Sequence, residues 1–153
     1  MPPEGMVHAL QEIRRLLRPR GLLIDIHPTL APKLIEVHHG EIITFSAPVP
    51  GQTFRDIQVA DDALAQVIQD GLFRIEQARE FEWRTYASSI AELRDYLAQE
   101  SAYDVGPSDE LVALQEGEFA ERVQGELQAL GEGSEVVRLY PARIARLAPD
   151  GSP

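Results

Sequence analysis

The sequence contains no cysteine, which excludes disulfide bonds, zinc–thiolate sites and cysteine nucleophiles. It also lacks a run of the roughly 20 apolar residues that a membrane-spanning helix requires. The first residues show no basic region followed by an apolar one, so no secretory signal peptide is expected. These absences predict a cytoplasmic protein that has no membrane partner.

Basic residues are scarce. The 153 residues include 14 Lys and Arg against 25 Asp and Glu, which gives a formal net charge of −11. Nucleic-acid binding requires clustered Lys and Arg, so no nucleic-acid partner is expected. The one basic patch lies between Arg14 and Arg20. It is suited to a local anion contact, although the negative end of a helix dipole explains it more simply.

Several catalytic motifs are absent as well. The chain has no Gly-x-Ser-x-Gly, no P-loop and no Gly-x-Gly-x-x-Gly. His38 and His39 are adjacent, and adjacent residues of a strand point to opposite faces. No third ligand occurs at a suitable spacing, so no metal site is expected there.

The chain is organised around a helix, a turn and a strand near its start. Helical spacing joins Met6, Leu10, Ile13 and Leu17 into one apolar stripe. Pro19 cannot continue the helix, and the glycine at position 21 allows the backbone to turn. The following residues, 22–26, form a nearly continuous apolar run. Such a run is typical of a strand that is buried on both faces of a parallel sheet.

The pattern Ala-Leu-x-Glu-Ile-x-Arg-Leu-Leu-x-Pro-x-Gly-x-Leu starts at Ala9. It resembles the helix and fifth strand of class I S-adenosylmethionine-dependent methyltransferases. The usual pattern has a second glycine where this chain has Arg20. The resemblance is strongest over residues 3–28. It implies an α/β fold: a partial Rossmann-like methyltransferase sheet with flanking helices and an inserted β-hairpin.

In that family the cofactor lies over a glycine-rich turn that precedes the matched pattern, and this chain has no such turn. The sequence therefore resembles only the C-terminal, substrate-side half of a small-molecule methyltransferase. We expect it to be inactive alone and to bind no S-adenosylmethionine by itself. In the complete family fold, S-adenosylmethionine is the cofactor and the partner is a small-molecule methyl acceptor.

The remaining elements follow from capping residues, turn residues and apolar periodicity. The resemblance makes residues 80–86 the sixth strand and 136–146 an antiparallel seventh. We expect one domain over residues 1–148 and a disordered tail over 149–153. The predicted elements are a hairpin at 34–45 turning at His38-His39-Gly40, a helix capped by Asp61 and Asp62, a strand at 73–86, a helix after a capping box at Ser89 and Glu92, a single long helix at 108–130, and a last strand at 135–147.

Candidate substrate-binding residues lie where ligands bind in open α/β sheets, at the carboxyl ends of strands. Asp25 and His27 occupy that end of the first strand, just before Pro28. A simpler interpretation places Asp25 in a helix-capping network and His27 in solvent. Trp83 and Tyr86 are aromatic candidates for packing over a small substrate, although strand aromatics more often belong to a core or an interface. The sequence assigns no catalytic or cofactor-binding residue.

A second hypothesis makes the chain a non-catalytic protein. Without a neighbouring fourth strand, the apolar strand between Leu22 and Ile26 leaves one edge open. Open strand edges pair readily with another chain. The chain then either self-associates or binds another partner through this exposed edge, and a homodimer joined there would cover it.

Overall fold

The computed structural model describes residues 3–102 and 106–150. The chain divides into two compact units. The first unit comprises the chain up to Leu30, residues Phe54–Phe81, and the chain from Pro141 onward. The second comprises Ala31–Thr53 and Glu82–Tyr140. Of the predicted tail, residues 151–153 lie outside the described residues.

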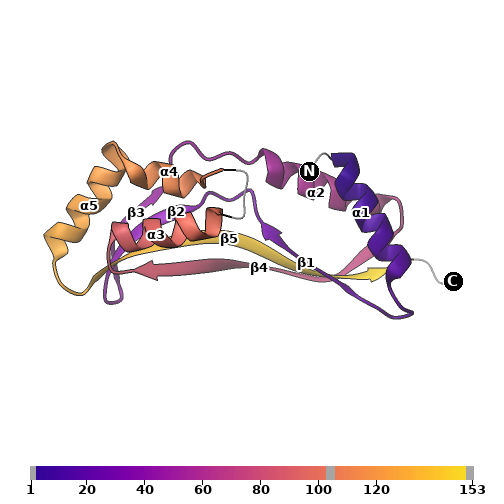
Figure 1. Cartoon of the computed structure of the whole chain (residues 1–153). Coiled ribbons are helices and arrows are strands. Elements are labelled where there is room, and N and C mark those ends of the chain that lie inside the picture. Colours follow the sequence, from indigo (N-terminus) through magenta and orange to yellow (C-terminus); the bar gives the residue numbers. More distant parts are fainter. Residues whose placement is uncertain (1–2, 103–105, 151–153) are drawn as a thin grey trace. The chain divides into compact units, whose positions relative to one another are not determined.

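The first unit combines two helices with three strand segments. Its elements are α1 (Pro3–Leu16), β1 (Leu23–Pro28), α2 (Arg55–Gln69), the first part of β4 (Phe73–Ala87) and the second part of β5 (Ser134–Pro149). Within this unit α1 and α2 lie on one face of the strands (Figure 1). β1 pairs antiparallel with β5, and Leu23 is opposite Leu147. The buried cluster under the helices contains Leu64, Val67, Phe73, Ala145 and Leu147.

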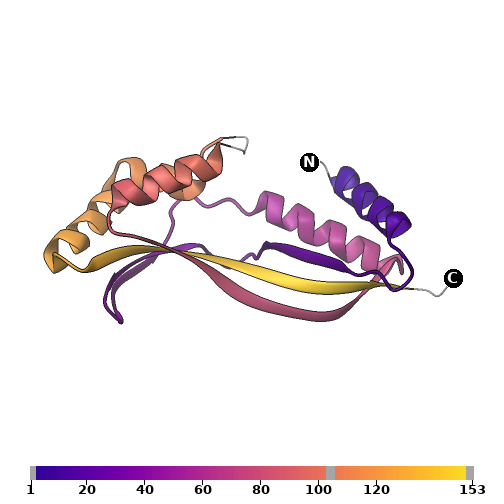
Figure 2. The same ribbon diagram turned by 60° about the horizontal axis from the view of Figure 1, so that its bottom comes forward.

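The other face of β1 is not covered by a helix of this unit (Figure 2). Ile24 and Ile26 point to that face, and they are 52% and 61% exposed. Among the described residues, β1 pairs only with β5. The prediction of a strand buried on both faces of a parallel sheet is therefore wrong. A run of apolar residues does not reveal whether both faces of the strand are covered, and here only one is.

The second unit contains a hairpin, three helices and the remaining parts of β4 and β5. Its own elements are β2 (Leu34–His39), β3 (Ile42–Pro48), α3 (Ile90–Ser101), α4 (Asp109–Gln115) and α5 (Glu118–Leu130). β2 and β3 pair antiparallel around Gly40, whose φ is +60°, so the predicted hairpin is confirmed. The turn is at residues 40 and 41, because His38 and His39, which were predicted to lie in it, belong to β2. The buried core beneath the helices includes Ile35, Val37, Leu93, Leu97, Leu114 and Val123.

The strands pair in the order β1-β5-β2-β3, and β4 also pairs with β5. β1 and β2 are both antiparallel to β5, and Figure 1 draws β4 and β5 in opposite directions. The α/β class is thus correct, whereas the sheet is antiparallel throughout. No helix in the described part of the chain is both long and apolar enough to cross a bilayer.

Two predicted helix boundaries are wrong. α2 begins at Arg55 after Phe54, which makes no side-chain capping bond, so Asp61 and Asp62 lie inside the helix. The predicted helix at 108–130 is two helices, because Gly117 between them has a φ of +106° that helical backbone cannot adopt.

The predicted capping box before α3 forms in part. The hydroxyl of Ser89 accepts a hydrogen bond from the backbone N–H of Glu92 at 3.2 Å. The Glu92 carboxylate accepts from the backbone N–H and hydroxyl of Ser88 rather than from Ser89. Either way, donors that the helix start leaves unpaired are satisfied.

Candidate functional site

The alternation of β1 places Asp25 and His27 on its helix-covered face. Leu23, which shares that face, packs in the buried cluster of the first unit. Asp25 is opposite Ala145 and His27 is opposite Arg143 on β5. The same face therefore changes from apolar to polar toward the carboxyl end of β1.

Four side chains meet at that end. His27 Nδ1 lies 2.7 Å from Asp25 Oδ2, and His27 Nε2 lies 2.9 Å from Asp61 Oδ1. Arg143 Nη2 lies 3.3 Å from His27 Nε2 and 3.4 Å from Asp61 Oδ1. We call Asp25, His27, Asp61 and Arg143 the polar cluster. The His27 side chain is only 12% exposed, so it does not point into solvent.

The helix α2 supplies Asp61. Residues three apart lie on the same side of a helix, so Asp61 shares a face with buried Leu64. That face packs on the sheet, which brings the Asp61 carboxylate to His27. Sequence reasoning missed Asp61 because aspartate is so common as a cap. The three-residue spacing from Asp61 to Leu64 was the signal that could have placed Asp61 on the sheet-facing side of the helix.

Sequence reasoning also missed Arg143. It alternates along β5 with Ala145 and Leu147, which are both fully buried. An arginine on the buried face of a strand needs a carboxylate partner, because an unpaired buried charge is costly. The alternation alone was enough to predict an acidic partner for Arg143, and that partner is Asp61.

The contacts of the polar cluster constrain where the imidazole protons lie. An ionised carboxylate only accepts hydrogen bonds, so Nδ1 of His27 donates to Asp25. Nε2 either donates to Asp61 or accepts an N–H of Arg143. Asp25 therefore orients the ring, and Nε2 faces Asp61 and Arg143. A histidine oriented in this way is suited to general acid–base chemistry.

Arg143 also has an unsatisfied donor. Its Nε atom is buried and has no hydrogen-bond partner among the described residues. A buried donor left unpaired costs about 1–3 kcal/mol. Such costs are uncommon in folded proteins, and they call for a local explanation.

The four predicted site residues belong to two different units, two to each. Asp25 and His27 are in direct contact, as described above. Trp83 and Tyr86 lie on the part of β4 that belongs to the second unit, where they are 59% and 51% exposed. The Tyr86 ring contacts the edge of the His38 ring, with centroids 6.3 Å apart. A substrate-binding role of these four residues stays a prediction.

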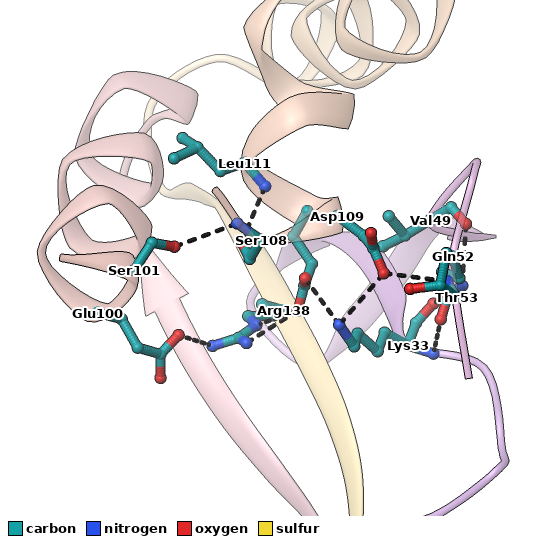
Figure 3. A network of polar contacts seen from close by, with 11 residues as sticks. Lys33, Val49, Gln52, Thr53, Glu100, Ser101, Ser108, Asp109, Leu111 and Arg138 are labelled. Atoms are coloured by element: carbon teal, nitrogen blue, oxygen red, sulfur yellow. Dashed lines mark hydrogen bonds and ion pairs between the residues drawn. The ribbon is translucent and has the colours of Figure 1, made fainter. Parts of the chain in front are cut away.

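A second polar network lies within the second unit and ties α4 to β5 (Figure 3). Glu110 is fully buried, and its two carboxylate oxygens accept hydrogen bonds from Arg138 at 2.8 Å and from Lys33 at 3.0 Å. Arg138 also donates to Glu100 at 2.8 Å. Burial alone would raise the pKa of Glu110, but the charges of Arg138 and Lys33 outweigh it and hold that pKa below its ordinary value. Because both carboxylate oxygens are paired, we assign this network a structural role.

A third polar group is the buried pair of Glu36 and His38 on β2. His38 Nε2 lies 2.7 Å from Glu36 Oε2, and the hydroxyl of Ser46 donates to Glu36 Oε1 at 3.0 Å. The serine proton therefore goes to a carboxylate and not to the histidine. A nucleophilic serine requires the direct contact with its base, so these residues do not form a catalytic triad.

No protein-family model, curated protein or solved structure matches this chain.

Proposed function

We propose that this chain is the acceptor-side half of a small-molecule methyltransferase-like fold, in which the polar cluster binds the reacting hydroxyl of the acceptor. The observation that carries the proposal is the position of His27 between Asp25 and Asp61 at the carboxyl end of β1. β1 is the strand that the sequence pattern likens to the fifth strand of the family. The parallel sheet that the resemblance implies binds ligands at that end, but β1 is antiparallel to β5, so the contacts of His27 carry the proposal.

The pairing of β1 also supports this proposal. The resemblance assigned an antiparallel orientation to the last strand, and β5 is antiparallel to β1 along the whole of β1. The helix and turn before β1 form where the pattern predicts them. The inserted hairpin forms as well, and it pairs with the first part of β5 rather than with β1.

The residues of this chain do not fit the cofactor of the family. S-adenosylmethionine requires a close backbone approach at a glycine-rich turn. The described glycines with positive φ occur singly in turns and loops, and a Cβ atom added to them would meet nothing closer than 3.7 Å. We therefore derive no step that involves the methyl donor, and the proposal concerns the acceptor alone.

The proposed chemistry of the cluster is a proton transfer. A hydroxyl of the acceptor, bound beside Asp61, gives its proton to Nε2 of His27. Asp25 holds the proton on Nδ1 and stabilises the imidazolium that forms. The guanidinium of Arg143 stabilises the negative charge left on the acceptor oxygen. His27 is then the base, Asp25 the orienting residue and Arg143 the electrostatic partner.

Phenol is a suitable probe, because its ionisable hydroxyl resembles that of a tyrosine side chain. We expect phenol to shift the amide resonances around His27 and Asp61 in a saturable manner. The His27→Gln variant should lose these shifts, whereas His8→Gln, which changes an exposed histidine of the same unit, should keep them. No saturable shift at the cluster would contradict the proposal. Isothermal titration with S-adenosylmethionine should show no micromolar binding, and micromolar binding would overturn the assignment of an acceptor-side half.

A second candidate function is self-association, and the uncovered face of β1 favours it. The strand has a free edge among the described residues, and Ile24 and Ile26 are both exposed beside that edge. Light scattering should then detect a dimer that Ile26→Lys separates. Ile42→Lys, which changes an exposed isoleucine of the second unit, should leave the dimer intact. A monomeric wild-type protein would rule out this function.

A further inference from the structure

Four arginines line one hollow of the first unit. The hollow has a volume of about 910 Å³ and does not include the polar cluster. α1 and the turn after it supply Arg14, Arg18 and Arg20, and β4 supplies Arg74. The acidic residues that line it are Glu76 and Asp150. This concentration of positive charge contrasts with the net charge of −11 on the whole chain.

Two of these arginines have their guanidinium groups occupied. Arg14 donates to the carbonyl of Leu72 at 3.2 Å, and Arg74 donates to Glu76 at 3.0 Å. Glu76 also pairs with Arg146 at 2.8 Å, so its negative charge is shared between two arginines. The side chains of Arg18 and Arg20 are exposed, and neither makes a hydrogen bond or ion pair within the described part of the chain. Their guanidinium groups are therefore available to a ligand.

The backbone of Arg20 is the second, independent observation. Its φ is +66°, and it is the one non-glycine residue with a positive φ among residues 3–102 and 106–150. The N–H of Gly21 donates to the carbonyl of Arg18 at 2.8 Å across this turn. Pro19 occupies the second position of this four-residue turn, and Arg20, with its positive φ, occupies the third. This combination is the signature of a type II turn.

Glycine is the usual residue at the third position of that turn, and arginine is strained there. The methyltransferase pattern likewise has glycine at this position. The backbone conformation therefore gives no reason for an arginine at position 20. The reason for the arginine must lie in what its side chain does. Strained residues of this kind cluster at ligand sites.

We propose that the hollow binds a small anion that carries more than one phosphate group. The planar guanidinium groups of Arg18 and Arg20 suit phosphate oxygens, which arginine binds through two parallel hydrogen bonds. The volume lies within the range of small-molecule sites. The strongly negative chain as a whole repels large polyanions, which favours a small ligand over a nucleic acid. The inference is independent of the proposed function, because none of its residues belongs to the polar cluster.

Isothermal titration with inorganic tripolyphosphate tests the proposal. We expect saturable binding that Arg18→Gln and Arg20→Gly each weaken about five- to tenfold, as the loss of a charge-assisted hydrogen bond requires. Arg79→Gln is the matched control, because Arg79 is exposed on β4 of the same unit and does not line the hollow. It should leave the affinity unchanged. Arg20→Gly should also raise the melting temperature of the ligand-free protein, because glycine relieves the strained turn.

Three results would overturn the proposal. One is the absence of binding at millimolar tripolyphosphate. Another is an equal loss of affinity in Arg79→Gln, which would show diffuse attraction to the surface and not a site. The third is tighter binding of a short single-stranded oligonucleotide than of tripolyphosphate, which would indicate a nucleic-acid ligand.

Discussion

The imidazole of His27 and the carboxylate of Asp25 are joined by a 2.7 Å contact between two residues of the same strand. Residues two apart on a strand share a face, so this contact is set by the local backbone of β1. It turns Nε2 of His27 toward α2, where it meets Asp61 at 2.9 Å. Strand and helix thereby hold one histidine at both of its nitrogens.

The contact between His27 and Asp61 should contribute to the stability of the protein. Asp61→Asn removes the charge and keeps the shape, so we expect a loss of about 1–2 kcal/mol in the free energy of unfolding, measured in urea. Asp62→Asn is the neighbouring control, because Asp62 is exposed and accepts a hydrogen bond from the side chain of Gln58 one turn earlier on the same helix. It should cost less than about 0.5 kcal/mol. Equal losses in the two variants would contradict the structural account of the cluster.

The buried carboxylate of Glu110 predicts a pH dependence of stability. Its pKa in the folded protein lies below the ordinary value of 4.5, because Arg138 and Lys33 outweigh the effect of burial. Its contribution is therefore complete above pH 4.5 and is lost as the pH falls through the lower, folded-state pKa. Unfolding titrations from pH 7 down to acid should show this loss.

The Glu110→Gln variant should remove that part of the pH dependence. At neutral pH it should also lower the free energy of unfolding by about 3–5 kcal/mol, because Lys33 and Arg138 lose their buried countercharge. Glu116→Gln alters an exposed carboxylate close by and should change neither property. A Glu110→Gln protein with the wild-type acid profile would refute the structural role of this network.

Two glycines of the helical segment should respond in opposite directions to alanine. Gly117 separates α4 from α5 with a φ of +106°, where alanine is strained, so Gly117→Ala should cost about 1–3 kcal/mol. Gly125 lies inside α5, and a Cβ added there meets open space. Gly125→Ala should therefore stabilise the protein by about 0.5–1 kcal/mol. Thermal unfolding of both variants checks the signs, and a stabilising Gly117→Ala would support one continuous helix instead.

Local signals predicted most of the elements, because turns and caps depend on neighbouring residues. Gly40 indicated the hairpin, and Ser89 with Glu92 indicated the start of α3. Apolar periodicity predicted a single helix over residues 108–130, which runs through Gly117. Its positive φ could not be deduced from its neighbours, so the break between α4 and α5 was missed.

What covers each face could not be predicted from a local run of residues. Ile24 and Ile26 are as apolar as core residues, yet the face to which they point carries no helix of their unit. The candidate site was half predicted for a related reason. Asp25 and His27 belong to one strand, whereas Asp61 and Arg143 reach them only through the packing of α2 and the pairing of β5.

The most direct test of the central claim is long-range proton–nitrogen NMR of the His27 ring, recorded with and without saturating phenol. We predict a proton on Nδ1 in both states and a large change in the Nε2 resonance when phenol binds. Asp25→Asn should weaken the preference for a proton on Nδ1. If the Nε2 resonance stays unchanged under saturating phenol, His27 does not contact the hydroxyl of an acceptor and the proposed function is wrong.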